Sequence, residues 1–285
     1  MFATRSLARR IEHAEAALVG DGAAAAAARP DDHGAFVRRL NGGVAAFTEP
    51  GAPLNKVIGL GFDGVPSASD LADVEAAYAA RGCPVIVELS SFADAEAGRV
   101  LTRRGYELIA FENVSGVPLD AGAHPAPPAG IDIEAVGEAD AESWLETVTV
   151  GFQHQDVYDG NPSHEAYNPE VVRRAVNAMA AVEHFERFVA RRGGEVAGGA
   201  SFRCFQGVAQ MCGSATLPAH RRRGVQTALL HHRLAAAARA GCDVAVVTTQ
   251  AGSKSQQNVE RFGFGLLYVR AILTRGDAAT PLDAH

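Results

Sequence analysis

The chain carries one sequence pattern twice, and this repetition constrains its fold more than any other feature. Residues 80–89 (ARGCPVIVEL) resemble residues 239–248 (RAGCDVAVVT), because each stretch reads as a helix end, a glycine stop and a buried strand. A glycine followed by an aromatic residue comes at nearly the same distance downstream in each copy, at Gly105 and at Gly263. The interval between these markers accommodates one helix in both copies.

The two copies extend in the same way toward the N-terminus. A predicted strand over 56–62 precedes a predicted helix over 69–81, just as a strand over 208–216 precedes a helix over 225–239. Two units of strand–helix–strand–helix–strand are the simplest interpretation.

A proline-rich stretch separates the copies. Residues 120–130 hold three prolines among small residues, a composition that favours an extended linker. We therefore expect one domain over 1–119 and a second over 131–285. Upstream of the first copy, apolar residues at helical spacing predict a helix that ends before Arg29-Pro30.

Composition narrows the range of partners. The 285 residues are 47% hydrophobic, as buried cores require, and the formal net charge is −7. This acidic balance argues against nucleic acid or an anionic membrane as a partner, since both need a clustered basic face. No stretch of roughly 20 apolar residues is present, so we expect a cytoplasmic protein. The four cysteines lack CxxC spacing, and we expect them to be reduced, buried thiols.

The turn before the helix at 225–239 is strongly basic. Arg221, Arg222 and Arg223 precede Gly224, and the backbone N–H groups of residues 222–227 fall in the unsatisfied first turn of the helix. Free N–H groups, the helix dipole and arginine charges together suit a phosphate, although a helix start with a solvated basic cluster is the alternative. In the first copy, Ser67, Ser69 and Asp70 can cap the corresponding helix instead, so we expect that copy to lack an anion site.

These elements together resemble the GNAT superfamily of acyl-CoA N-acyltransferases. The family signature Gln/Arg-x-x-Gly-x-Gly/Ala is similar to Arg221-x-x-Gly224-x-Gln226, and the family's asparagine before a Gly-Phe pair is similar to Asn258 before Gly263-Phe264. The resemblance implies an α/β (α+β) fold of two GNAT-like units, each a mixed, mostly antiparallel sheet flanked by helices. Residues 33–118 resemble a degenerate unit.

The resemblance also implies an activity and a coenzyme site. The expected reaction is transfer of an acetyl group from acetyl-CoA to a small-molecule amine by direct attack in a ternary complex, with no metal. The residues implied to bind coenzyme A are Thr216, Leu217, Arg222, Arg223, Gly224, Val225, Gln226, Thr227 and Asn258. A monomer and a homodimer both remain open.

The sequence departs from the family pattern at catalytic positions. Val259 occupies the place of the family's tyrosine general acid, and Tyr268 and Ser255 are the nearest substitutes. The predicted strand over 208–216 contains no carboxylate, so an obvious general base is absent. The segment 151–167 concentrates polar side chains that are expected to border the acceptor, namely His154, Asp156, Tyr158, His164 and Tyr167. A solvated surface loop is the alternative interpretation of this segment.

The missing tyrosine and the substituted Gln226 also support a second function class. A non-catalytic sensor or interaction protein would bind acyl-CoA without turnover. A metal site is not expected at His220, His231 and His232, because adjacent residues on a helix point in different directions.

Overall fold

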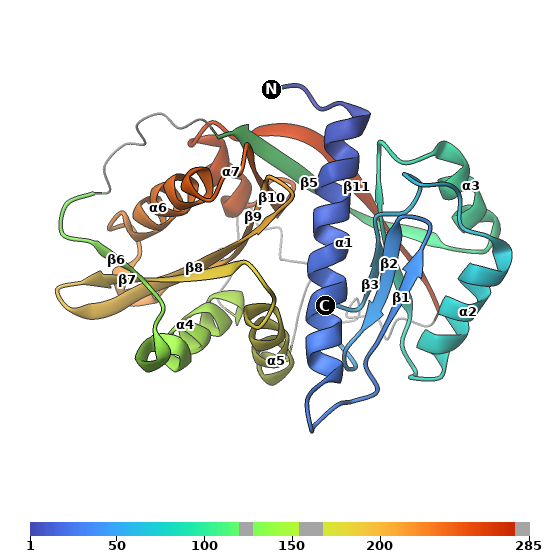
Figure 1. The fold of residues 1–285 in the computed structure, drawn as a ribbon, viewed down its shortest axis with the longest axis horizontal. Helices are drawn as coiled ribbons and strands as arrows, with labels where there is room; N and C mark the ends of the chain where they lie inside the picture. Colours follow the sequence, from blue (N-terminus) through green and yellow to red (C-terminus); the bar gives the residue numbers. More distant parts are fainter. Residues whose placement is uncertain (120–127, 154–167, 277–285) are drawn as a thin grey trace, which may run out of the picture.

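The computed structural model describes residues 1–119, 128–153 and 168–276. Within these residues the strands form one continuous sheet in the order β1-β2-β3-β4-β11-β5-β10-β9-β8-β7-β6 (Figure 1). The strands are β1 Phe36–Leu40, β2 Gly43–Phe47, β3 Lys56–Ile58, β4 Val85–Ser90, β5 Glu107–Pro118, β6 Asp132–Ala135, β7 Phe185–Arg192, β8 Glu195–Phe205, β9 Val208–Thr216, β10 Val244–Gln250 and β11 Gly265–Arg275. The helices are α1 Arg5–Ala27, α2 Ala68–Ala79, α3 Ala95–Arg103, α4 Ala141–Gln153, α5 Pro169–Ala180, α6 Val225–Arg239 and α7 Lys254–Glu260.

The internal repeat is present in the structure. The first copy runs β3-α2-β4-α3-β5 and the second runs β9-α6-β10-α7-β11. In each copy the first two strands pair in parallel, β3 with β4 and β9 with β10, whereas every other strand pair in the described residues is antiparallel. The predicted mixed, mostly antiparallel sheet flanked by helices is therefore confirmed.

The two copies exchange their last strands. Strand β11 of the second copy lies between β4 and β5, and β5 of the first copy pairs with β10 (Figure 1). The linker separates the halves along the sequence, but each half completes the other half's sheet. The sequence gives no sign of this exchange, because the pattern of a strand does not identify its partner.

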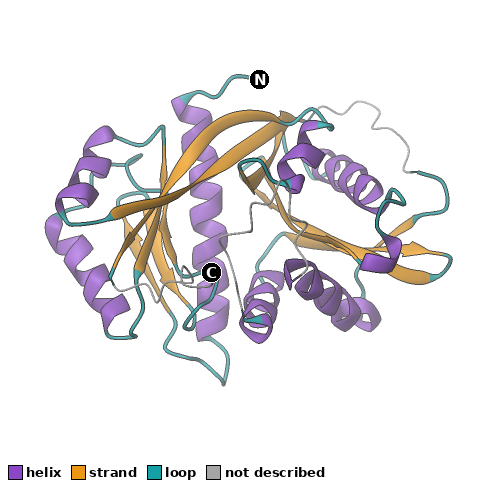
Figure 2. Ribbon diagram, turned by 180° about the vertical axis from the view of Figure 1, so that it is seen from behind, coloured by secondary structure: helices purple, strands orange, loops and turns teal. Residues whose placement is uncertain are grey.

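Helix α1 lies across the centre of the molecule and contacts both halves. Thr4 caps its first turn by accepting from the Leu7 N–H at 3.2 Å, and the helix ends at Ala27, before Arg29-Pro30 as predicted. It packs on β2 and β9 and against α5. Figure 2, which views the molecule from behind, shows this long helix passing along the strands. None of the described helices has the length and apolar character needed to cross a membrane.

A buried polar network attaches α1 to the exchanged strand. Glu12 of α1 accepts hydrogen bonds from the Tyr268 hydroxyl at 2.7 Å and from Arg270 Nε at 2.8 Å. Arg270 also reaches Glu88 of β4 at 3.3 Å, and Lys56 of β3 pairs with the same carboxylate. Arg270 is 1% exposed and Glu12 is fully buried. Burial raises the pKa of Glu12 above its ordinary value, because its effect is larger than that of the Arg270 charge, which lowers the pKa.

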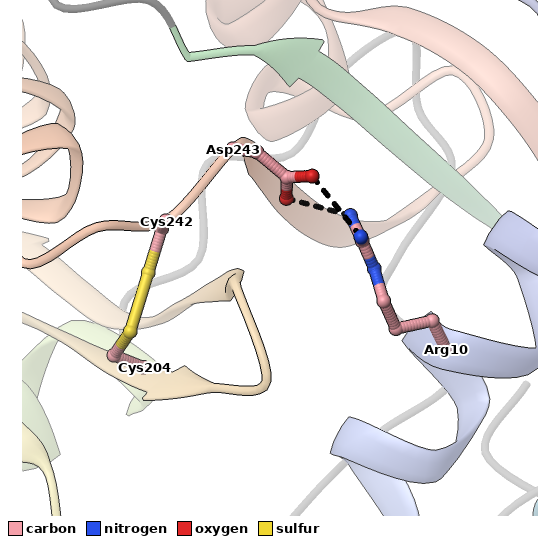
Figure 3. The surroundings of a disulfide bond; sticks show 4 residues. All are labelled: Arg10, Cys204, Cys242 and Asp243. Atoms are coloured by element: carbon pink, nitrogen blue, oxygen red, sulfur yellow. Dashed lines mark hydrogen bonds and ion pairs between the residues drawn. A yellow bond between two sulfur atoms is a disulfide. The ribbon is translucent and has the colours of Figure 1, made fainter.

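The cysteines depart from expectation. Cys204, in β8, and Cys242, just before β10, form a disulfide (Figure 3), so the expectation of four reduced thiols was wrong for this pair. The two residues lie 38 positions apart and come together only through the fold. Beside them, Asp243 forms a two-point ion pair with Arg10 of α1, with distances of 2.6 and 3.0 Å. Cys83 and Cys212 are free.

Candidate active site

The parallel strands β9 and β10 diverge after a short paired stretch. Their register covers only Val208–Gln210 against Val244–Val246. Beyond this point β9 continues along β8 and β10 continues along β5, so a wedge opens between residues 211–216 and residues 247–250. Strand edges that face such an opening offer backbone N–H and C=O groups to an extended, amide-containing ligand.

A bulge shapes the β9 side of the wedge. Ala200 of β8 pairs with Ser214 and Ser201 pairs with Cys212, so Gly213 is the extra residue, and its φ of +28° favours glycine. The bulge reverses the alternation of side chains, which directs Ser214 toward α6. A glycine inside a strand pattern is the sequence sign of such a bulge.

Arg233 of α6 holds this bulge in place. Its Nη1 donates to the Ser201 carbonyl at 3.0 Å and to the Cys212 carbonyl at 3.2 Å. The side chain is 3% exposed, and burial lowers the pKa of Arg233 to about 10. A buried cation bonded to two carbonyls therefore fixes the strand at the point where the wedge is formed.

The basic turn leads into α6 with uncapped N–H groups. Gly224 is the N-cap residue at φ +83°, without a side-chain cap, and Arg222 is also left-handed at φ +57°. The first helical hydrogen bond runs from the Ala228 N–H to the Gly224 carbonyl at 2.9 Å. The N–H groups of residues 225–227 therefore have no intrahelical acceptor. Arg222 and Arg223 are exposed beside them, which gives the turn the charge and donors that an anion requires.

The corresponding helix of the first copy begins with a capping box of its own side chains. Ser67 caps α2 by accepting from the Asp70 N–H at 3.1 Å, and the Ser67 N–H donates to the Asp70 carboxylate at 3.2 Å. The predicted self-capped start is thus confirmed. Helix α1 also covers the end of β3, because Arg5 donates to the Gly61 carbonyl at 3.1 Å and Arg9 Nε donates to Asp63 at 2.9 Å.

Gln226, which replaces the family's glycine or alanine, points away from the turn. Its Oε1 accepts from the Ser214 hydroxyl at 3.0 Å, so the side chain lies along β9. The backbone N–H of Gln226 is consequently not covered by its own side chain.

Replacement of Gln226 with alanine is expected to change acetyl-CoA affinity by less than about threefold. The side chain supplies only a hydrogen bond to Ser214, and a net hydrogen bond of this kind is worth about 1 kcal/mol or less at an exposed position. Calorimetric titration of the variant with acetyl-CoA measures the change. A loss of more than about tenfold would show that the glutamine itself contacts the ligand.

The remaining residues expected to bind the coenzyme differ in their availability. Leu217 has its N–H bonded to the Ala197 carbonyl at 3.0 Å and its carbonyl bonded to the His220 N–H at 2.9 Å. Its backbone groups are therefore already engaged. The Thr216 hydroxyl is buried without a hydrogen-bond partner in the described residues and remains available to a ligand. Asn258 is half-buried on α7, the helix that follows β10.

The three proposed catalytic side chains lie in different surroundings. Tyr268 is 4% exposed on β11, and β5 separates that strand from β10. Burial and the Glu12 carboxylate raise the pKa of Tyr268 well above its ordinary value, so the phenol is a weak proton donor held inside the network. Ser255 is exposed in the first turn of α7. His154 lies outside the described residues, as do Asp156, Tyr158, His164 and Tyr167.

The histidines singled out in the sequence pack against aromatic rings. His231 lies edge-on to Phe262 and His232 lies edge-on to Phe188, each with ring centroids 4.8 Å apart. In the described ranges, no group of three or more histidine, cysteine, aspartate or glutamate side chains is arranged to hold a metal ion.

The site combines an open parallel strand pair with an uncapped, basic helix start, an arrangement that suits a phosphate-bearing ligand with an extended amide arm.

Residues 152–264 match the model of the acetyltransferase (GNAT) family. The second half of the chain is therefore similar in sequence to GNAT acetyltransferases over these residues. No curated protein sequence matches the chain.

Solved structures extend the likeness in fold to nearly the whole chain. A GCN5-related N-acetyltransferase from Kribbella flavida is 17% identical, with a TM-score of 0.61 over 91% of this chain and 97% of that one. A tandem GNAT protein from the clavulanic acid biosynthesis pathway is 15% identical, with a TM-score of 0.60 over 96% of this chain and 95% of that one. The protein thus has the fold of GNAT proteins, including a tandem member.

Proposed function

We propose that the protein is an N-acetyltransferase that moves an acetyl group from acetyl-CoA to the amine of a small molecule. The observation that carries this proposal is the uncapped start of α6 beside the wedge between β9 and β10. The helix start suits the pyrophosphate, while the wedge suits the pantetheine arm. The domains are proposed to be 1–119, a degenerate GNAT-like unit, and 131–285, the acetyltransferase unit, joined by the linker at 120–130.

The proposed reaction is a direct transfer within a ternary complex. The amine nitrogen attacks the carbonyl carbon of the acetyl thioester, a C–N bond forms, the C–S bond breaks, and coenzyme A leaves as the thiolate. Backbone groups of β9 around the bulge would polarise the thioester carbonyl, since fixed dipoles stabilise developing charge without reorganisation. Ser255 and His154 remain the candidates to protonate the thiolate, although water can also do so.

A turnover screen tests this proposal. Release of free thiol from acetyl-CoA is followed in the presence of amines, amino acids and aminoglycosides, and the acetylated product is identified by mass spectrometry. We expect at least one primary amine to be acetylated. Acetyl-CoA binding without transfer to any acceptor would instead support the non-catalytic sensor, an alternative that the buried Tyr268 and the valine at position 259 favour.

A further inference from the structure

The proposed reaction needs a base that β9 does not supply. A primary amine is mostly an ammonium ion at neutral pH, and it must lose a proton before its nitrogen can attack. Strand β9 has no carboxylate among its residues Val208–Thr216. Any carboxylate near the thioester must therefore come from another element.

The geometry of the wedge indicates where the thioester lies. The phosphate anchor at the start of α6 follows the Thr216 end of β9, so the pantetheine arm would run from there toward the vertex of the wedge. The vertex is at Gln210 and Val246, the last paired residues of β9 and β10. The stretch from Thr216 back to Gln210 is roughly 20 Å long at about 3.3 Å per residue. The reacting end of the coenzyme would accordingly approach Gln210.

Helix α1 brings a carboxylate to this vertex. Gln210 is 3% exposed, and its Nε2 donates to Glu15 Oε2 at 2.9 Å. The Gln210 Oε1 is buried without a partner in the described part of the chain, and Glu15 itself is half-buried. Burial and, after it, the Glu15 carboxylate raise the pKa of the Cys212 thiol to about 12, so Glu15 lies near the residue that precedes the Gly213 bulge.

Glu15 differs from the other acidic residues of α1 that face the sheet. Glu12 is bonded to Tyr268 and Arg270, and Asp21 is paired with Arg203 at 2.5 Å. The described hydrogen bond of Glu15 is with a neutral amide, and Arg270 acts on Glu15 through its charge, without a hydrogen bond or ion pair between them in the described residues. The charged and titratable groups around it are Glu12 of α1, Cys212 of β9, and Tyr268 and Arg270 of β11.

We infer that Glu15 is the general base for the acceptor amine, supplied by the N-terminal half to the active site of the C-terminal half. This inference rests on the proposed function. The Glu15 carboxylate takes one proton from the ammonium, directly or through one water, and becomes a carboxylic acid. The neutral amine then attacks the thioester, and as the tetrahedral intermediate collapses the second amine proton passes, through water, Ser255 or His154, to the coenzyme A thiolate. Gln210 holds the carboxylate in position.

The test compares acceptors that need a base with one that does not. Thiol release from acetyl-CoA is measured for wild type, Glu15→Gln and Glu15→Asp, with spermidine, lysine and n-propylamine as ammonium acceptors. Hydroxylamine, which is uncharged at neutral pH, is the base-independent nucleophile, and the uncatalysed rates are subtracted. Glu183→Gln, an exposed carboxylate on a turn, is the matched control.

We expect Glu15→Gln to lower kcat/KM by roughly 100- to 10,000-fold for the ammonium acceptor that wild type uses best, and by less than about threefold for hydroxylamine. Glu15→Asp should have a kcat/KM for that ammonium acceptor at least about tenfold higher than that of Glu15→Gln. Both Glu15 variants should bind acetyl-CoA with wild-type affinity, and Glu183→Gln should have wild-type kcat/KM. Equal losses with both kinds of nucleophile, or no loss with either, would overturn the inference. Wild-type protein that binds acetyl-CoA but acetylates none of these acceptors, nor any other acceptor of the turnover screen, would overturn it together with the proposed activity, while leaving the coenzyme site intact.

Discussion

Replacement of Gly224 with aspartate is expected to weaken acetyl-CoA binding by about a hundredfold or more. The residue lies at the uncapped start of α6, where the proposed pyrophosphate site needs close approach of the backbone. A Cβ here would lie 3.3 Å from Pro128 Cγ, and the carboxylate would both repel the phosphates and cap the free N–H groups. Loss of one charge-assisted contact alone costs about 1.5–3 kcal/mol, or roughly ten- to a hundredfold in affinity. Calorimetric titration measures the loss.

Two controls separate charge from shape and from position. Gly224→Asn has nearly the same size and tolerates the left-handed backbone equally well, but it is neutral. It should bind acetyl-CoA at least about tenfold more tightly than Gly224→Asp. Gly64→Asp alters a left-handed glycine in the corresponding turn of the first copy and should leave affinity unchanged. An equal loss in the aspartate and asparagine variants would point to strain and not to an anion site.

Replacement of Arg270 with methionine is expected to lower the free energy of unfolding by about 3–5 kcal/mol. The substitution removes a fully buried cation and leaves Glu12 buried without a cationic partner, whereas Glu88 keeps its ion pair with Lys56, and an unpaired buried charge carries a penalty of this size. Because these residues lie on β11, α1 and β4, the loss should affect both halves together. Urea unfolding followed by circular dichroism measures the difference.

The same substitution at Arg275 provides the matched control. Arg275 lies on the same strand and pairs with Glu75, but its side chain is 38% exposed, and an ion pair of that kind contributes about 0–1 kcal/mol. Addition of Glu12→Gln to Arg270→Met should recover part of the stability, since it removes the buried charge that lost its cationic partner. Equal effects of Arg270→Met and Arg275→Met would contradict a structural role for the buried network.

The sequence was most informative where local chemistry decides the structure. Helix α6 and strand β9 have the predicted bounds, because a glycine stop, apolar periodicity and an uncapped basic turn are local signals. The capping of α2 by Ser67 and Asp70 followed from the same local chemistry.

The sequence was least informative where distant segments meet. The exchange of β5 and β11 places Tyr268 beside α1 and two strands away from β10, although sequence distance had suggested a catalytic position. The disulfide and the contact between Glu15 and Gln210 likewise join segments whose spacing carries no signal. The missing carboxylate on β9 was visible in the sequence, but its replacement from α1 became visible only in the fold.

The number of acetyl-CoA molecules bound by each chain tests the central claim most directly. Isothermal titration of wild-type protein should give one site per chain, and the double variant Arg222→Glu with Gly224→Asp should show no binding at ligand concentrations that saturate wild type. Two sites per chain would contradict the account of the first copy as closed by its own cap and by α1. Unchanged affinity in the double variant would contradict the assignment of the coenzyme site to the start of α6.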